Sequence, residues 1–187
     1  MKILVIVDMQ NDFINGSLGS PEAQAIVPYV CGKIKGLRND SDEIIITFDT
    51  HYNDYSNTLE GQKLPVEHCI WGTDGWNLNC EIKNTMENCF LPANTIRKET
   101  FGAIKDLPLN VKKIAISKAD SFNDVEVEIC GLCTDICVVS NALILRAAFP
   151  NMKITCDAKA CAGTSIEAHK AALMIMKSCQ IEVYNED

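Results

Sequence analysis

The chain has 187 residues, enough for one well-filled core and short for two, so we expect a single domain over residues 1–187. Hydrophobic residues make up 47% and charged residues 22%, a balance typical of globular proteins rather than disordered chains. The formal net charge of −8 disfavours nucleic acid and anionic membranes as partners, because both would repel an acidic surface.

The first apolar run, residues 1–8, is too short for a secretion signal and lacks a small-residue cleavage site. No run approaches the roughly 18 apolar residues that a membrane span needs. The ten cysteines are scattered through strand-like and helix-like segments, which suits buried thiols in a reducing compartment better than a disulfide framework. We therefore expect a cytoplasmic protein, and the sequence leaves a homo-oligomer open.

Short apolar runs alternate with helical patterns along the chain. The runs that predict strands are 2–7, 43–48, 95–98, 125–130, 153–156 and 181–184, and helical spacing occurs at 21–38, from the 131–138 stretch to about 148, and at 164–178. Segment 104–121 fits either a strand or a helix, and we choose a helix because 125–130 is the better strand. Segments 9–16 and 52–91 read as loops, and a loop as long as the second usually has a function.

Strands that alternate with helices predict a three-layer, doubly wound α/β fold with a mainly parallel sheet of about six strands. Such sheets place their sites outside the carboxyl ends of the strands. Asp8, Asp49, Lys98 and Cys137 all fall at or just past such ends. The chain has neither a GxGxxG nor a GxxxxGK[ST] run, so no dinucleotide or P-loop site is indicated.

Cys137 is the first candidate for chemistry. It lies where an apolar run turns into a helical one, and the free N–H groups and dipole of a helix start favour a thiolate. The alternative is a small buried hydrophobic residue, as most intracellular cysteines are. A nucleophilic thiol also needs a cation and an acid or base, for which Lys98 and Asp8 are candidates. Taken singly, each of these two also fits an ordinary structural role.

A metal site is the second candidate. Asp49 and His51 stand two residues apart, so on extended chain they point to the same side, and His68 follows in the long loop. A carboxylate with imidazoles suits a divalent ion such as zinc or manganese, although exposed loop histidines are an alternative. A structural zinc site among the cysteines at 130–161 is weaker, because no second pair completes a tetrahedral set. We interpret His169, within the last helical segment, as structural.

Five short motifs follow one another in register over nearly the whole chain: DMQNDF at 8–13, DTH at 49–51, PVEHC with GT at 65–73, KETF at 98–101 and GLCTDICV at 131–138. Together they resemble the isochorismatase-like cysteine hydrolases, specifically the metal-binding, nicotinamidase-type branch. The resemblance implies a Rossmann-like sheet and a catalytic triad of Asp8, Lys98 and Cys137. It also implies an oxyanion hole from the backbone N–H groups of Cys133 and Cys137, and a cis peptide bond before Cys133.

The same resemblance implies a metal-binding set. Asp49, His51 and His68 match the ligands of metal-binding members, and Glu60 is the best match for a fourth, acidic ligand. The implied cofactor is one divalent metal ion, with zinc as the first choice and manganese or iron as alternatives.

The implied reaction is the hydrolysis of an amide C–N bond, in which nicotinamide and water give nicotinate and ammonia through a Cys137 thioester, as in NAD salvage. Phe13, Trp71 and Phe101 are candidate pocket walls that would stack on a flat ring, with ordinary packing as their alternative.

The chain departs from the nicotinamidase pattern at Pro65, where an aromatic residue is common, and Glu67 adds a charge near the expected metal. A related cysteine hydrolase of another small amide or carbamoyl substrate is therefore an alternative. A non-catalytic, cysteine-rich metal-binding or redox module is the alternative outside enzymes.

Overall fold

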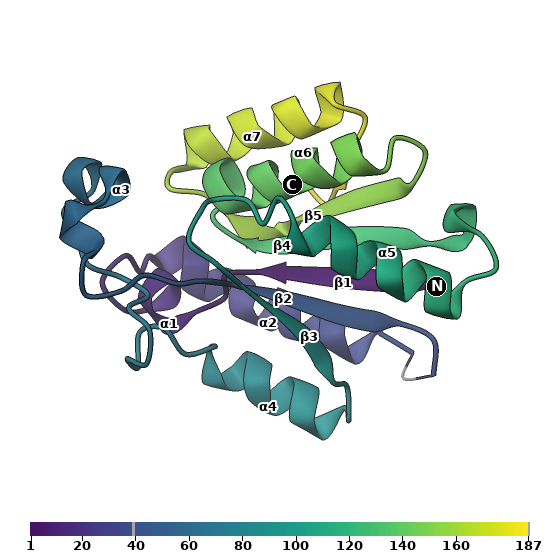
Figure 1. The fold of residues 1–187 in the computed structure, drawn as a ribbon, viewed down its shortest axis with the longest axis horizontal. Helices are drawn as coiled ribbons and strands as arrows, with labels where there is room; N and C mark the ends of the chain where they lie inside the picture. Colours follow the sequence, from purple (N-terminus) through teal and green to yellow (C-terminus); the bar gives the residue numbers. More distant parts are fainter. Residues whose placement is uncertain (39, 187) are drawn as a thin grey trace.

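The computed structural model describes residues 1–38 and 40–186, and in these the strands form one parallel sheet between layers of helices (Figure 1). The strands are β1 (Lys2–Val7), β2 (Glu43–Asp49), β3 (Ala93–Lys98), β4 (Glu126–Leu132), β5 (Lys153–Ala162) and β6 (Glu182–Tyr184). Their order is β3-β2-β1-β4-β5-β6, and each neighbouring pair is parallel. The predicted doubly wound α/β fold is confirmed.

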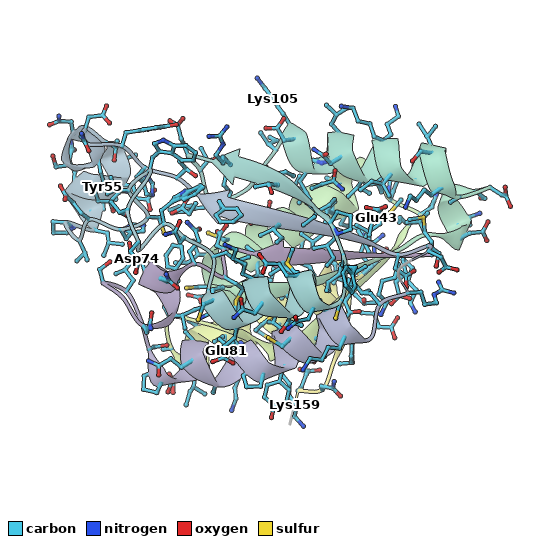
Figure 2. All side chains as sticks on the ribbon, turned by 90° about the horizontal axis from the view of Figure 1, so that it is seen from below. Glu43, Tyr55, Asp74, Glu81, Lys105 and Lys159 are labelled. Atoms are coloured by element: carbon cyan, nitrogen blue, oxygen red, sulfur yellow. The ribbon has the colours of Figure 1, made fainter. Side chains whose placement is uncertain are left out.

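The longer helices cover both faces of the sheet. Helices α2 (Pro21–Lys35) and α4 (Cys80–Asn88) lie together on one face, α5 (Asp106–Lys118) and α6 (Val139–Ala148) lie on the other, and α7 (Ile166–Ser178) packs beside α6. Figure 2 shows the two layers from below, with Lys105 at the start of α5 on one side and Glu81 of α4 on the opposite side. Within the described residues, we find no helix with the length and apolar character of a membrane span.

Several short elements lie between the longer ones, and those at 11–14, 55–57 and 59–63 occupy segments that the sequence predicted as loops. They are α1 (Asn11–Ile14), the 3-10 helices η1 (Tyr55–Asn57) and η2 (Phe122–Asp124), α3 (Leu59–Lys63), and a turn of π-helix, η3 (Thr134–Val138). The long loop 52–91 thus contains α3 and α4. Segment 104–121 contains α5, so the choice of a helix there is confirmed.

The end of β5 and the start of the last helix differ from the predicted boundaries. β5 does not end at residue 156: after Ile129 pairs with Cys156, Gly131 pairs with Cys161, so the strand bulges and continues to Ala162. Asp157 is therefore inside the strand rather than past its end, where it pairs with Lys33. The last helix begins at Ile166, because the hydroxyl of Ser165 accepts a hydrogen bond from the third following N–H group and caps it.

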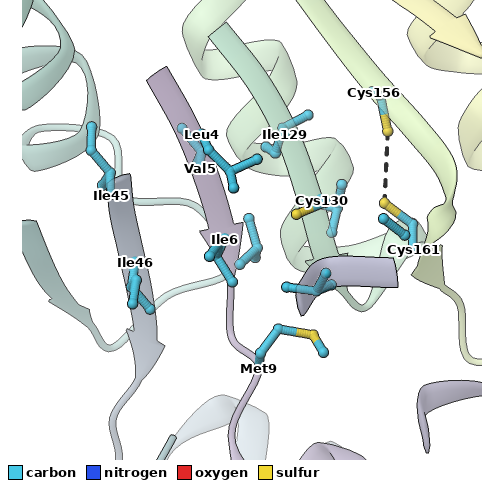
Figure 3. Close-up of a cluster of buried hydrophobic side chains, with 14 of the residues drawn as sticks. Leu4, Val5, Ile6, Met9, Ile45, Ile46, Ile129, Cys130, Cys156 and Cys161 are labelled. Atoms are coloured by element: carbon cyan, nitrogen blue, oxygen red, sulfur yellow. Dashed lines mark hydrogen bonds between the residues drawn. The ribbon is translucent and has the colours of Figure 1, made fainter. Parts of the chain in front are cut away.

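The core fills both faces of the central strands (Figure 3). The aliphatic side chains drawn there come from β1, β2 and β4 and are buried, among them Leu4, Val5, Ile6, Ile45, Ile46 and Ile129. Each such side chain stabilises the fold by about 1.5–3 kcal/mol when it leaves water. This packing fixes the carboxyl ends of β1, β2 and β4, which is where the predicted chemical groups begin.

Candidate active site

The carboxyl ends of β1 and β4 meet where the strand order changes direction, which is the usual place for a site in an open α/β sheet. Gly131 makes this approach possible. Its φ is +120°, and a Cβ there would lie 2.1 Å from the carbonyl oxygen of Val7, so only glycine fits. The peptide bond between Leu132 and Cys133 is cis, as the resemblance implies.

The three expected catalytic side chains are brought together and buried. The Nζ atom of Lys98 lies 2.7 Å from Oδ2 of Asp8 and donates a hydrogen bond of 3.5 Å to Sγ of Cys137. Asp8 is fully buried, and the other two are 5% exposed. Asp8 has a φ of +47°, a strained backbone conformation of the kind that clusters at functional sites. On its other side, the hydroxyl of Thr47 donates to Oδ1 of Asp8 at 2.7 Å.

The protonation of this group differs from the expectation of an ionised thiol. Burial and the neighbouring Asp8 carboxylate raise the pKa of Cys137, and they outweigh the opposing effect of Lys98. Burial also raises the pKa of Asp8 despite Lys98. Although burial acts to lower it, the pKa of Lys98 is raised because Asp8, Cys137 and Asp49 surround it. The thiol therefore keeps its proton, and Asp8 is the adjacent acceptor.

The candidate metal ligands also meet. Asp49, His51, Glu60 and His68 each present one ligand atom, and these atoms all lie within 4.8 Å of one another. Oδ2 of Asp49 is 3.0 Å from Nε2 of His51 and 3.5 Å from Nε2 of His68. Oε1 of Glu60 is 3.8 and 3.7 Å from the same two nitrogens. Two imidazoles with two carboxylates fit a divalent ion such as zinc.

The second nitrogen of His68, Nδ1, hydrogen-bonds the carbonyl of Val66 at 2.8 Å, so Nε2 faces the other ligands. Within residues 1–38 and 40–186, no other group of three or more His, Cys, Asp or Glu side chains brings its ligand atoms together in this way. The alternative of a structural zinc site among the cysteines is therefore not supported.

Asp49 connects the metal-binding set to the triad. While its Oδ2 faces the imidazoles, its Oδ1 lies 3.2 Å from Nζ of Lys98. Burial acts to raise the pKa of Asp49, but Lys98 and the hydrogen bonds from His51 and His68 lower it well below its usual range. The carboxylate is therefore ionised and shared between the two groups.

Two supporting residues were missed by the reasoning from sequence. The buried amide of Gln10 accepts from the N–H of Asp49 at 2.8 Å and donates to its carbonyl at 2.9 Å. Oδ2 of Asp12 accepts from the N–H of Cys69, next to His68, at 2.7 Å. Both lie in the 8–13 motif, whose polar residues were the available signal. Their partners are more than 35 residues away, so spacing alone gave no role.

A cavity of about 480 Å³ connects the thiol and the metal-binding set, within the range typical of small-molecule sites. Cys133 and Cys137 line this cavity, and so do Asp49, Glu60 and His68. The walls between them are largely apolar and include Phe13, Leu64, Phe101, Leu132 and Ile136. The structure thus supports Phe13 and Phe101 as pocket walls.

Trp71 was wrongly expected in this wall. Its ring is not part of the cavity lining and stands edge-on to Trp76, with ring centroids 4.5 Å apart, while the guanidinium of Arg97 covers it. The departures from the family pattern, Pro65 and Glu67, are exposed and also lie outside the lining. Glu67 does not belong to the metal-binding set. Neither departure therefore contributes a side chain to the cavity lining.

His169 lies outside the cavity and hydrogen-bonds the hydroxyl of Thr134 through Nδ1 at 2.8 Å, in agreement with a structural role.

A larger cavity, about 730 Å³, lies at the opposite, amino-terminal end of the strands. Its two buried carboxylates, Glu128 and Asp157, both pair with the partly exposed Lys33. The chemistry is therefore concentrated at the carboxyl ends.

The parallel, doubly wound sheet and the buried thiol, carboxylate and ammonium groups at its carboxyl ends together define a hydrolase of the cysteine-dependent kind. The isochorismatase domain model matches residues 2–186, so the chain belongs to the isochorismatase family and is an enzyme that hydrolyses an amide C–N bond. It is 27% identical to a nicotinamidase of Schizosaccharomyces pombe, over 98% of this chain and 92% of that protein.

Two crystal structures share the fold. The nicotinamidase of Bacillus subtilis matches with a TM-score of 0.80 and 26% identity, over 98% of this chain and 99% of the other. The pyrazinamidase of Pyrococcus horikoshii in complex with zinc matches with a TM-score of 0.77 and 26% identity, over 98% of both chains. The similarity therefore extends over the full length of each protein.

Proposed function

We propose that the protein is a metal-dependent cysteine amidohydrolase that converts nicotinamide and water to nicotinate and ammonia. The observation that carries the proposal is a largely apolar cavity lined both by Cys137 and by Asp49, Glu60 and His68 of the metal-binding set. Similarity to nicotinamidases supports the choice of substrate. The cytoplasmic location expected from the sequence is part of this proposal.

The proposed first half-reaction uses the triad. The thiol of Cys137 attacks the amide carbon as Asp8 accepts its proton, and the backbone N–H groups of Cys133 and Cys137 stabilise the oxyanion. Asp8 then gives the proton to the leaving nitrogen, and ammonia departs from a Cys137 thioester. Lys98 keeps its positive charge between two buried carboxylates and faces the sulfur throughout.

The second half-reaction regenerates the thiol. Asp8 takes a proton from a water molecule as that water attacks the thioester carbon, and the proton passes to the sulfur as nicotinate leaves. The rings of Phe13 and Phe101 are placed to hold the flat ring of the substrate and to keep other water away from the thioester.

Asp49, His51, His68 and Glu60 would hold the divalent ion. When bound, the ion supplies a Lewis acid that can take the ring nitrogen of the substrate as a ligand. Zinc suits the two imidazoles best, and manganese or iron would also accept this mixed set of ligands. The direct check is the metal content of the purified protein, compared with that of His68→Ala.

The deciding experiment measures ammonia and nicotinate released from nicotinamide, and maps by mass spectrometry the residue that carries a trapped acyl adduct. We expect turnover, an adduct on Cys137, and loss of turnover by a factor on the order of 10³ or more in Cys137→Ala. The matched control, Cys133→Ala, removes a thiol from the same cavity and should still give the Cys137 adduct.

Other outcomes separate the alternatives. Turnover of a carbamoyl compound with none of nicotinamide would support the related hydrolase. Unchanged ammonia release from nicotinamide in Cys137→Ala would refute the catalytic assignment. Metal binding with no turnover of any small amide would favour a non-catalytic module.

A further inference from the structure

The loop 99–103 directly follows Lys98 and carries one wall of the substrate cavity. Phe101 lines the 480 Å³ cavity on one side and a second cavity of about 450 Å³ on the other. The side chain therefore forms a partition between the two spaces. Because Phe101 is 48% exposed, its own packing cannot fix the position of this partition.

One side chain outside the triad joins this loop to the nucleophile. Asn141 lies in α6, one helical turn after Cys137, and is fully buried. Its Oδ1 accepts a hydrogen bond from the N–H of Ala103 at 2.9 Å. Its Nδ2 donates to the carbonyl of Cys137 at 2.8 Å and to the carbonyl of Phe101 at 3.3 Å. Both donor hydrogens and the acceptor are thus used.

The loop also lies directly on α6. A Cβ at Gly102 would come within 2.4 Å of Cδ1 of Ile144, so glycine permits this close approach. Few other side chains could replace the amide of Asn141. Leucine would leave the buried N–H of Ala103 without a partner, and aspartate would set a carboxylate against two carbonyl oxygens.

We propose that Asn141 is a positioning residue that fixes the cavity wall at Phe101 relative to the Cys137 thiol, an inference that rests on the proposed amidase function. It acts through the loop and touches neither the substrate nor the reacting atoms. A displacement of about 1 Å in such a wall can cost on the order of 10²-fold in rate, because the substrate is then misaligned with the nucleophile.

The primary variant is Asn141→Thr. A threonine hydroxyl can still bond the carbonyl four residues earlier, that of Cys137, but it is too short to bridge to Phe101 and Ala103. The matched control is Asn110→Thr. Nδ2 of Asn110 donates to the carbonyl of Asp106, also four residues earlier, at 2.8 Å, but on the exposed side of α5.

The first measurement is hydrogen exchange of the peptide that contains residues 99–105, which requires no turnover. We expect at least tenfold faster exchange of the Ala103 amide in Asn141→Thr and no change in Asn110→Thr. Unchanged exchange in a folded Asn141→Thr protein would overturn the proposal. If that variant does not fold, Asn141→Ser, which is smaller at the same site, undergoes the same comparison.

The second measurement is a double-mutant cycle with Phe101→Ala, read as KM and kcat for nicotinamide. We expect Asn141→Thr to raise KM about tenfold when Phe101 is present and less than twofold when it is absent, because the effect passes through that ring. If Asn141→Thr raised KM by the same factor with Phe101 and with Ala at that position, Asn141 would have a merely structural role and the proposal would be refuted. If the unsubstituted protein does not hydrolyse nicotinamide, the proposed function fails, whereas the exchange comparison still decides the role of Asn141.

Discussion

The hydrogen bond from Thr47 to Asp8 offers a test of the proposed base that leaves the triad itself intact. Thr47→Val keeps the shape of a fully buried side chain and removes only the hydroxyl that donates to Oδ1 of Asp8 at 2.7 Å. A hydrogen bond to a charged group contributes about 1.5–3 kcal/mol. Because the bond favours the ionised carboxylate and acts to lower the pKa of Asp8, its loss should raise that pKa further.

The assay is the pH dependence of kcat/KM for nicotinamide. Asp8 must be ionised to accept the proton of the thiol, so the acid limb of the profile should move to higher pH by about one unit or more in Thr47→Val. Thr155→Val is the control, because Thr155 is also buried and donates to a carboxylate, that of Glu126, at 3.3 Å in a strand pair away from the triad. An acid limb that stays in place or moves to lower pH in Thr47→Val would refute the role of Asp8.

Three further predictions concern stability and metal binding. Gly131→Ala should lower the free energy of unfolding by about 3 kcal/mol or more, or prevent folding, because its Cβ would meet the carbonyl of Val7; denaturant unfolding measures this. Hydrogen bonds from Arg38 and backbone N–H groups outweigh burial and lower the pKa of Asp42 from 3.8 to about 2. The ionised form of Asp42 therefore contributes about 1–2 kcal/mol to the free energy of unfolding above pH 4, and this contribution is lost as pH falls towards 2. In Asp42→Asn, the free energy of unfolding should depend less on pH between 4 and 2. His68→Ala should lower the metal content measured by mass spectrometry, and equal metal content would remove His68 from the ligand set.

The sheet was predictable because its strands have a simple physical signature. β1 and β2 are short, largely apolar runs buried on both faces, and a carboxylate directly follows β1 (Asp8) and ends β2 (Asp49). The bulge in β5 has no such signature. Asp157 and Lys159 interrupt the apolar pattern, and the strand continues only because the approach at Gly131 and the partner Lys33 accommodate it.

The candidate site was predictable in its reactive groups and less so in its surroundings. Cys137, Lys98 and Asp8 fall at strand ends, where topology alone brings them together. The position of Trp71 depends on how an aperiodic loop folds back onto Trp76, which the sequence pattern does not encode. The same holds for Asn141, whose partners lie in a loop about 40 residues earlier.

The balance of buried charge explains why the two halves of the site belong together. Asp8, Asp49 and Glu60 bring three carboxylates to one end of the sheet, and Lys98 is the ammonium group that pairs with two of them. Burial and the charge of Asp49 raise the pKa of Glu60, as burial raises that of Asp8, which is the response expected of surplus negative charge in a low-dielectric region. In the proposed function, a divalent cation held by Asp49 and Glu60 with the two imidazoles would supply the two positive charges that balance these carboxylates. Because Asp49 faces both Lys98 and the imidazoles, metal binding and the protonation of the triad depend on the same carboxylate.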